Sequence, residues 1–220
     1  MLFRSHRLSA YVAEPHGAPA GAVVVVQEIF GLTPWIRRVA DAHAADGYRA
    51  VAPAMFDRVE RDVVLTYADV QTGRGYMQKL EWPQTLADVA AAAAFAAEGA
   101  VGLRVAVVGY CWGGTVAHVA AAELELAAAV AYYGSGVARM LDRRPRCPVM
   151  YHFGEQDHAI PLADVDAVRR ALPGAAVHVY DGAAHGFACE DRPSYDRAAA
   201  ALADERTRAF LRSAFARALT

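Results

Sequence analysis

A possible cysteine nucleophile lies in the segment GYCWGG (109–114), which follows the apolar run LRVAVV. A Gly-x-nucleophile-x-Gly turn between a strand and a helix holds its central residue in a strained conformation at the helix N-terminus. The partial positive charge there favours a thiolate. Most such turns carry serine, so Cys111 could be a nucleophile, a buried structural residue or a redox-active thiol.

A thiol with an ordinary pKa of ~8.5 is mostly protonated at neutral pH and therefore needs a base. His185 is our candidate, because it lies between Ala184 and Gly186 in a loop after the last predicted strand. His158 is the rival base. The orienting acid should follow a strand that lies between nucleophile and base in the sequence, which favours Asp157 in FGEQDH (153–158).

Glu155 is a rival for the role of acid, because it occupies the same strand end. The order nucleophile, acid and histidine along the chain is nevertheless that of the α/β-hydrolases, and it differs from the orders in the two other well-known triad folds. Three suitable residues at strand ends in this order indicate a hydrolase triad far more specifically than any one of these residues does.

Two backbone amides could form an oxyanion hole. In this fold one donor is the N–H of the residue after the nucleophile, here Trp112, and the other comes from the loop after an early strand, here Ile29. The neighbouring Glu28 has two interpretations. It could accept a hydrogen bond from the Cys111 thiol, or it could be a strand-end carboxylate that faces solvent.

Several aromatic residues near these segments could line a substrate site or belong to the core. They are Phe30, Trp35, Tyr76, Tyr133 and Phe187.

Short β-branched runs alternate with alanine-rich helical segments along the chain. The expected strands are 21–29, 48–54, 103–109, 125–134, 147–154 and 175–182. The expected helices are 33–47, 83–99, 112–123, 136–143, 162–172 and 194–218, and residues 55–83 are expected to be largely irregular. This alternation predicts right-handed βαβ crossovers and a mostly parallel sheet with helices on both faces. Ligands of such sheets gather beyond the carboxyl ends of the strands, where the candidate residues lie.

The chain has no linker-like segment, repeat or charge block, so residues 1–220 are expected to form one domain. A hydrophobic content of 55% is sufficient for a sizeable core. The net charge of -2 gives no reason to expect nucleic acid or a membrane as a partner. We expect a small-molecule substrate and a monomer or small homo-oligomer.

The three cysteines are widely spaced and odd in number, which fits neither a disulfide framework nor a CxxC zinc site. We therefore expect no metal and no cofactor. The N-terminal residues lack an apolar stretch of signal-peptide length, and no run reaches the roughly 18 apolar residues of a membrane span. The expected location is the cytoplasm.

The sequence resembles the dienelactone hydrolase family of the α/β-hydrolase superfamily. The segments that carry the resemblance occur in the family's order and cover nearly the whole chain: VVVVQEIFGLTPWIRRVAD, VAVVGYCWGGTVAH, AVAYYGSG, FGEQDHAIP, DGAAHGFA and AALADERTRAFL. The combination of GYCxGG with QEIFG is specific, since generic α/β-hydrolases use serine and lack the glutamate.

The resemblance implies a triad of Cys111, Asp157 and His185, with Glu28 as the glutamate that governs thiol activation. In the family this glutamate holds the resting thiol neutral and takes its proton when substrate binds, which protects the thiol from oxidation. The implied substrates are lactones of the carboxymethylenebutenolide type, which arise in chlorocatechol and related aromatic degradation.

This chain departs from the family pattern at one arginine that binds the substrate carboxylate. The position four residues after the histidine is Cys189, and the second arginine of the family corresponds to Arg74 in the stretch 69–77. The loss of one guanidinium removes a charge-assisted contact. Hydrolase chemistry is therefore better supported than the dienelactone itself.

The leading interpretation is a cysteine-dependent lactone or ester hydrolase that forms an acyl-enzyme on Cys111. One alternative keeps the triad but acts on a simple carboxylester or thioester. A remote alternative is a non-catalytic ligand-binding or redox-sensing relative, which has no need of Asp157 and His185.

Overall fold

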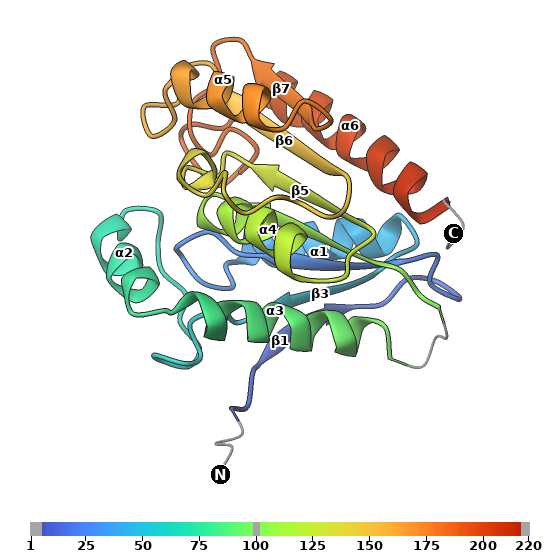
Figure 1. Ribbon diagram of the computed structural model, residues 1–220. Helices are drawn as coiled ribbons and strands as arrows, with labels where there is room; N and C mark the ends of the chain where they lie inside the picture. Colours follow the sequence, from blue (N-terminus) through green and yellow to red (C-terminus); the bar gives the residue numbers. More distant parts are fainter. Residues whose placement is uncertain (1–5, 99–101, 217–220) are drawn as a thin grey trace.

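A seven-stranded sheet forms the centre of the protein in the computed structural model, which describes residues 6–98 and 102–216. Figure 1 shows helices on both sides of this sheet. The strand order is β1-β3-β2-β4-β5-β6-β7, and only β1 is antiparallel to its neighbour. The strands are β1 (Ala10–Ala13), β2 (Ala22–Val26), β3 (Arg49–Pro53), β4 (Val105–Tyr110), β5 (Ala128–Tyr132), β6 (Val149–Gly154) and β7 (Ala176–Tyr180).

Helices follow most of the parallel strands. They are α1 (Pro34–Ala45), α2 (Val70–Gln78), α3 (Trp82–Ala96), α4 (Trp112–Glu123), α5 (Leu162–Ala171) and α6 (Arg197–Ala216), with a short 3₁₀ turn, η1 (Val137–Arg139). The mostly parallel sheet, helices on both faces and the predicted connectivity confirm the α/β-hydrolase fold class.

The central strands are apolar throughout because both of their faces are covered. All residues of β2 are fully buried, and alternate valines contribute to two different core clusters. Val23 and Val25 pack in the cluster that contains α1, whereas Val24 and Val26 pack with α3 and α4. Burial on both faces explains why β2 appears in the sequence as a continuous valine run.

The first crossover follows its sequence signals closely. The Thr33 hydroxyl accepts a hydrogen bond from the backbone of Ile36, Pro34 occupies the first turn, and Gly47 adopts a positive φ of 92° just beyond the helix. These are the expected start and stop of α1.

Three elements differ from the expectations. β1 was not predicted, because a four-residue edge strand carries little pattern. Residues 55–83 contain α2, whose two glycines weaken the helical signal. Residues 136–143 form only the turn η1 rather than a helix.

Several predicted element ends also move. The strand expected over 21–29 ends at Val26, which leaves Gln27, Glu28 and Ile29 in the following loop. The helix expected over 194–218 begins at Arg197, and its last predicted residues lie outside the described part of the chain. Residue 99, the expected end of the third helix, also lies outside it.

No helix among residues 6–98 and 102–216 combines the length and the apolar character that a bilayer crossing requires.

Candidate active site

Cys111 stands at a tight turn between β4 and α4. Its φ and ψ are 55° and -118°, a region that non-glycine residues rarely adopt. A Cβ on Gly109 would lie 1.8 Å from the carbonyl oxygen of Gly113, and a Cβ on Gly113 would lie 2.3 Å from that of Val26. Gly109 is therefore required for the close approach of β4 to the first turn of α4, and Gly113 for the close approach of that turn to β2.

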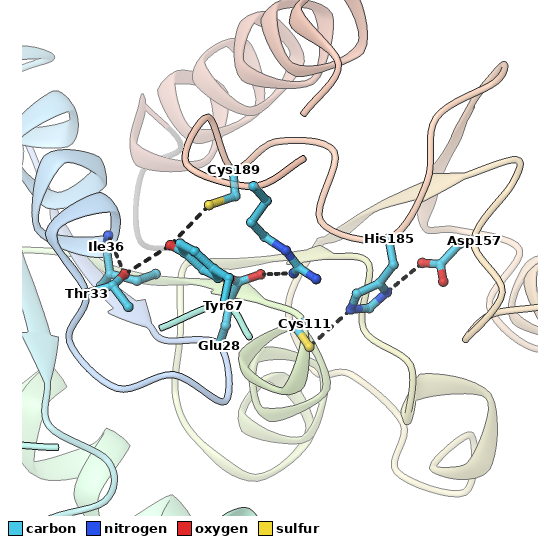
Figure 2. Close-up of polar contacts among 9 residues, drawn as sticks. Glu28, Thr33, Ile36, Tyr67, Cys111, Asp157, His185 and Cys189 are labelled. Atoms are coloured by element: carbon cyan, nitrogen blue, oxygen red, sulfur yellow. Dashed lines mark hydrogen bonds and ion pairs between the residues drawn. The ribbon is translucent and has the colours of Figure 1, made fainter. Parts of the chain in front are cut away.

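The structure brings Cys111, His185 and Asp157 together (Figure 2). His185 Nε2 lies 3.1 Å from Cys111 Sγ, and His185 Nδ1 lies 2.7 Å from Asp157 Oδ2. The other carboxylate oxygen of Asp157 accepts a hydrogen bond of 2.8 Å from the backbone of Ala159. Asp157 thus fixes the orientation of the imidazole, and the backbone of its own loop fixes the buried Asp157 carboxylate.

The rival residues occupy other positions. Glu155 is exposed, and its carboxylate accepts a hydrogen bond from the backbone of Gly182 at 2.8 Å. His158 lines the cavity described below but does not pair with Asp157, whose imidazole partner is His185.

The groups around His185 favour a positively charged imidazole. Burial opposes protonation of His185, but the neighbouring Cys111 and Asp157 outweigh it and raise the pKa of His185 to about 10. A charged imidazole 3.1 Å from Cys111 Sγ is suited to stabilise a thiolate at that position.

The two expected oxyanion donors are available. In the described structure the backbone N–H of Ile29 makes no hydrogen bond, and that of Trp112 is in the first turn of α4, where helical amides lack an internal partner. Both residues line the same cavity as Cys111. Gln27 helps to hold the loop, since its side chain bonds the backbone of Glu28 and of Met55.

Glu28 is almost completely buried, and its partner is Arg192 rather than Cys111. Arg192 Nη1 donates to Glu28 Oε1 at 2.9 Å, while Oε2 is buried without a partner among the described residues. Both interpretations from the sequence are therefore wrong for this arrangement, because the thiol is directed to His185 and the Glu28 carboxylate does not face solvent. Burial raises the pKa of Glu28, although Arg192 and His185 oppose the rise.

Arg192 is the functional candidate that sequence reasoning missed. Its guanidinium lies 5.7 Å from the ring centroids of Phe30 and Tyr67, and it lines the cavity. It lies seven residues after His185 rather than four. A search for any basic residue on the histidine loop, without a fixed spacing, could have found it.

Cys189, at the expected arginine position, has a different role. Its side chain is buried, and its thiol donates to the Tyr67 hydroxyl at 3.2 Å, which in turn donates to Thr33 at 3.4 Å. Cys189 does not line the cavity. The guanidinium is thus not lost from the site, because Arg192 supplies one from three residues further along.

A cavity of about 700 Å³ opens above Cys111. Its apolar wall includes Val70, Met77, Leu80 and Trp82 from α2, α3 and the segment between them. Arg74 and Phe30, two of the substrate-site candidates from the sequence, also line it, although Phe30 is nearly fully buried.

The other four aromatic candidates do not line this cavity. Trp35, in the first turn of α1, packs edge-on against Tyr110, and Tyr76 stacks on Phe56 and donates a hydrogen bond from its hydroxyl to Glu60. Tyr133 and Phe187 are fully buried. Tyr133 still contacts the site from behind, because its ring lies 5.1 Å from that of His185 in an edge-on arrangement.

The sequence model of the dienelactone hydrolase family matches residues 8–215. Carboxymethylenebutenolidase of Pseudomonas putida is 34% identical over 222 residues, which cover 95% of this chain and 92% of that protein. Among solved structures, a Klebsiella pneumoniae protein provisionally named dienelactone hydrolase matches with a TM-score of 0.85 and 31% identity, covering 98% of this chain and 95% of the other. This chain therefore belongs to the dienelactone hydrolase family and is a hydrolase.

Proposed function

We propose that this protein hydrolyses lactones or esters that carry a carboxylate, of the carboxymethylenebutenolide type, through an acyl-enzyme on Cys111. The observation that carries the proposal is the continuous hydrogen-bonded chain from Cys111 through His185 to Asp157 at the floor of a cavity. The name of the Pseudomonas putida relative supports the same substrate type.

In the acylation step, the Cys111 thiolate attacks the carbonyl carbon and forms a C–S bond. The developing oxyanion accepts hydrogen bonds from the amides of Ile29 and Trp112. Collapse of the intermediate breaks the bond to the leaving oxygen, which receives the proton from His185 Nε2. The product of this step is a thioester on Cys111 and a free alcohol, or a tethered one if the substrate is a lactone.

In the deacylation step, His185 takes a proton from water, and the resulting hydroxide attacks the thioester. The C–S bond breaks, the carboxylic acid departs, and the Cys111–His185 pair is restored. Asp157 keeps Nδ1 protonated and the imidazole in place throughout, which its 2.7 Å contact supports.

Arg192 and Glu28 fit a role in substrate-dependent activation. Arg192 lines the cavity and Glu28 does not, so the guanidinium stands between the buried carboxylate and an incoming substrate. A substrate carboxylate would compete with Glu28 for Arg192. Glu28 would then lose its counter-charge in a buried position, which favours its protonated form and links its charge to substrate binding.

The size of the cavity favours a second candidate, a carboxylesterase or thioesterase acting on bulkier substrates with the same triad. A volume of about 700 Å³ belongs to the range of sites that take drug-sized ligands, and it exceeds the needs of one five-membered lactone ring. A panel of dienelactone, linear carboxylate esters and thioesters would rank these substrates by kcat/KM.

Replacement of the nucleophile tests the proposal directly. Cys111→Ala should remove hydrolysis of dienelactone and of activated esters, and Cys111→Ser should retain only a small fraction of the rate. Mass spectrometry of the wild-type protein during turnover should show an acyl adduct on Cys111. Undiminished turnover in the alanine variant, or an adduct on another residue, would refute it.

A further inference from the structure

A polar side chain interrupts the apolar buried face of α6. The buried residues of this helix recur at the spacing of one helix face and are Ala199, Ala203, Thr207, Leu211 and Ala214. Thr207 is almost completely buried, although every other buried residue of this described helix is apolar. A hydroxyl in such a position needs hydrogen-bond partners, because its burial without them destabilises the fold.

Thr207 has these partners in a buried chain of hydrogen bonds that crosses three neighbouring strands. Its Oγ1 lies 2.7 Å from the Tyr132 hydroxyl at the end of β5 and 3.0 Å from His152 Nε2 in β6. His152 Nδ1 lies 2.7 Å from the Tyr180 hydroxyl at the end of β7. All four side chains are buried, and none of them lines the cavity above Cys111. A fully bonded network of this kind restricts its members to one arrangement.

The network reaches the nucleophile through Tyr132. The backbone N–H of Cys111 donates to the Tyr132 carbonyl at 3.0 Å, so the residue whose hydroxyl contacts Thr207 also holds the turn that carries the thiol. Tyr110, Tyr132 and His152 are register partners on adjacent strands. The Tyr132 ring centroid lies 4.7 Å from that of Tyr110 and 4.4 Å from that of His152. Tyr132 therefore links α6 to the turn at Cys111 through both its side chain and its main chain.

The same end of β5 also contacts His185. Tyr133 follows Tyr132, and its backbone N–H donates to the His152 carbonyl at 2.7 Å. The ring of Tyr133 lies 5.1 Å from that of His185 in an edge-on arrangement. A displacement of Tyr132 would therefore also move the side chain that packs behind His185.

Backbone strain makes this junction depend on its supporting contacts. Cys111 and Tyr133 have positive φ values of 55° and 38°, which residues other than glycine rarely adopt. The hydrogen bond from the Cys111 N–H to the Tyr132 carbonyl joins the two strained positions. Such conformations persist only where the surrounding contacts determine them. The bonds of Tyr132 to Thr207 and of Tyr133 to His152 are contacts of this kind.

We propose that Thr207 is a positioning residue for Cys111 and His185, and that it acts through the hydroxyl and the carbonyl of Tyr132. This inference rests on the proposed function where it concerns turnover. The reactivity of the Cys111 thiol reports on the same geometry without a substrate. Because Thr207 does not line the cavity, it affects the rate of the chemical step rather than the binding of substrate.

Two substitutions at position 207 separate the hydroxyl from the packing. Thr207→Val retains the shape of the side chain but leaves the Tyr132 hydroxyl and His152 Nε2 without this partner. Thr207→Ser retains the hydroxyl but removes a buried methyl group. Thr207→Val should lower kcat for phenyl acetate about tenfold with little change in KM, because small displacements of reacting groups strongly reduce the rate. Thr207→Ser should keep kcat close to that of the wild type.

Alkylation of Cys111 by iodoacetamide, followed by peptide mass spectrometry, gives a second measurement that does not depend on hydrolysis. At pH 7 the rate should fall severalfold in Thr207→Val, because a displaced turn loosens the 3.1 Å contact between Cys111 and His185. Thr207→Ser should react at nearly the wild-type rate. Tyr132→Phe should reproduce the loss, and the double variant that combines it with Thr207→Val should lose less than the sum of the two single effects.

Leu211→Val is the matched control for a general loss of stability. Leu211 is buried on the same face of α6 one turn after Thr207, and it has no polar group. Its truncation destabilises the core without removing a bond of the network. Measured below the unfolding temperature, Leu211→Val should retain the wild-type kcat and the wild-type alkylation rate.

Wild-type alkylation rates in Thr207→Val, or rates that fall alike in Thr207→Val, Thr207→Ser and Leu211→Val, would overturn the inference. Failure of the proposed function gives a different result, because phenyl acetate would then be hydrolysed as well by Cys111→Ala as by the wild type. The alkylation rates would in that case still decide the role of Thr207.

Discussion

Arg192 and Glu28 form a largely buried ion pair of 2.9 Å that separates the Glu28 carboxylate from the cavity above Cys111. The pair joins the loop after β7 to the loop after β2, 164 residues apart in the sequence. Arg192, which can bind a substrate carboxylate, thus contacts Glu28, whose protonation state can change. Substrate binding at Arg192 and protonation of Glu28 should therefore affect each other.

The effects of substitutions at Arg192 and Glu28 on the free energy of unfolding should be strongly coupled. Arg192→Met leaves Glu28 buried without a counter-charge and should cost about 3 kcal/mol of unfolding free energy. Glu28→Gln should cost less, because Arg192 retains contact with solvent in the cavity. The double variant should be more stable than the sum of the single losses predicts, and urea denaturation of all four proteins measures the coupling. Strict additivity would show that the two groups do not interact.

Gly186 should be required for the position of Arg192. Its φ is +81°, and a Cβ there would lie 2.4 Å from Arg192 Nη1. Gly186→Ala should therefore displace the guanidinium and raise KM for carboxylate-bearing esters by about tenfold, a change of roughly 1.4 kcal/mol. Gly182→Ala is the control, because that glycine also has a positive φ but a Cβ there would meet no atom within 4 Å. Similar KM values in both variants would contradict the assignment.

The reactivity of Cys111 toward iodoacetamide should depend on pH through His185. The pKa of His185 is raised to about 10, so the imidazolium persists across neutral pH and can stabilise a thiolate on Cys111. Alkylation should be fast and nearly constant from about pH 6.5 to 9 in the wild type. In His185→Gln the rate should instead follow an ordinary thiol with a pKa of ~8.5. A wild-type profile that rises in the same way as that of the variant would argue against the ion pair.

His43 should make the fold sensitive to acid. Burial lowers the pKa of His43 to about 4, with smaller contributions from Asp204, which raises it, and Arg208, which lowers it. Below pH ~6.5 the unfolded chain binds a proton at this position and the folded protein does not, so stability falls as the pH decreases toward 4. The loss attributable to His43 reaches about 3 kcal/mol.

The variant His43→Leu should lose less stability than the wild type between pH 7 and 4.5, as measured by thermal or urea unfolding. The test compares the loss of stability between the two pH values in the wild type with the loss in the variant. This comparison is needed because burial also lowers the pKa of His152 and His118, which destabilise the folded protein at low pH in the same way. Parallel stability curves for wild type and variant would contradict this assignment.

The sequence alone predicted six of the seven strands in order, and it singled out the three residues Cys111, Asp157 and His185 that the structure brings together. Strands buried on both faces must be continuously apolar, so β2 and β4 are visible as valine runs. Tight turns require glycine wherever the backbone approaches another strand, so the elbow around Cys111 is visible as well. The carboxyl ends of parallel strands share one edge of the sheet, which brought Asp157 and His185 to Cys111.

The weakly patterned elements were decided by tertiary contacts. α2 contains two glycines and has low intrinsic helical propensity, but Gly73 allows it to pack directly on Ile29. η1 is shorter than the predicted helix, and its ends are fixed by Thr115 and His118 rather than by local sequence. These contacts join residues far apart in the sequence, so no local sequence pattern indicates them.

The position of Arg192 was decided only by the folded loop. The backbone N–H of Asp196 donates to the carbonyl of Phe187 at 3.0 Å, so the intervening segment folds back on itself. This return brings Arg192 over Gly186 and to Glu28, while Cys189 is buried against Tyr67. Spacing along the chain identifies residues on regular elements, where side-chain direction repeats with a fixed period. In an irregular loop that period is absent, and only the three-dimensional path of the backbone determines which side chain reaches the site.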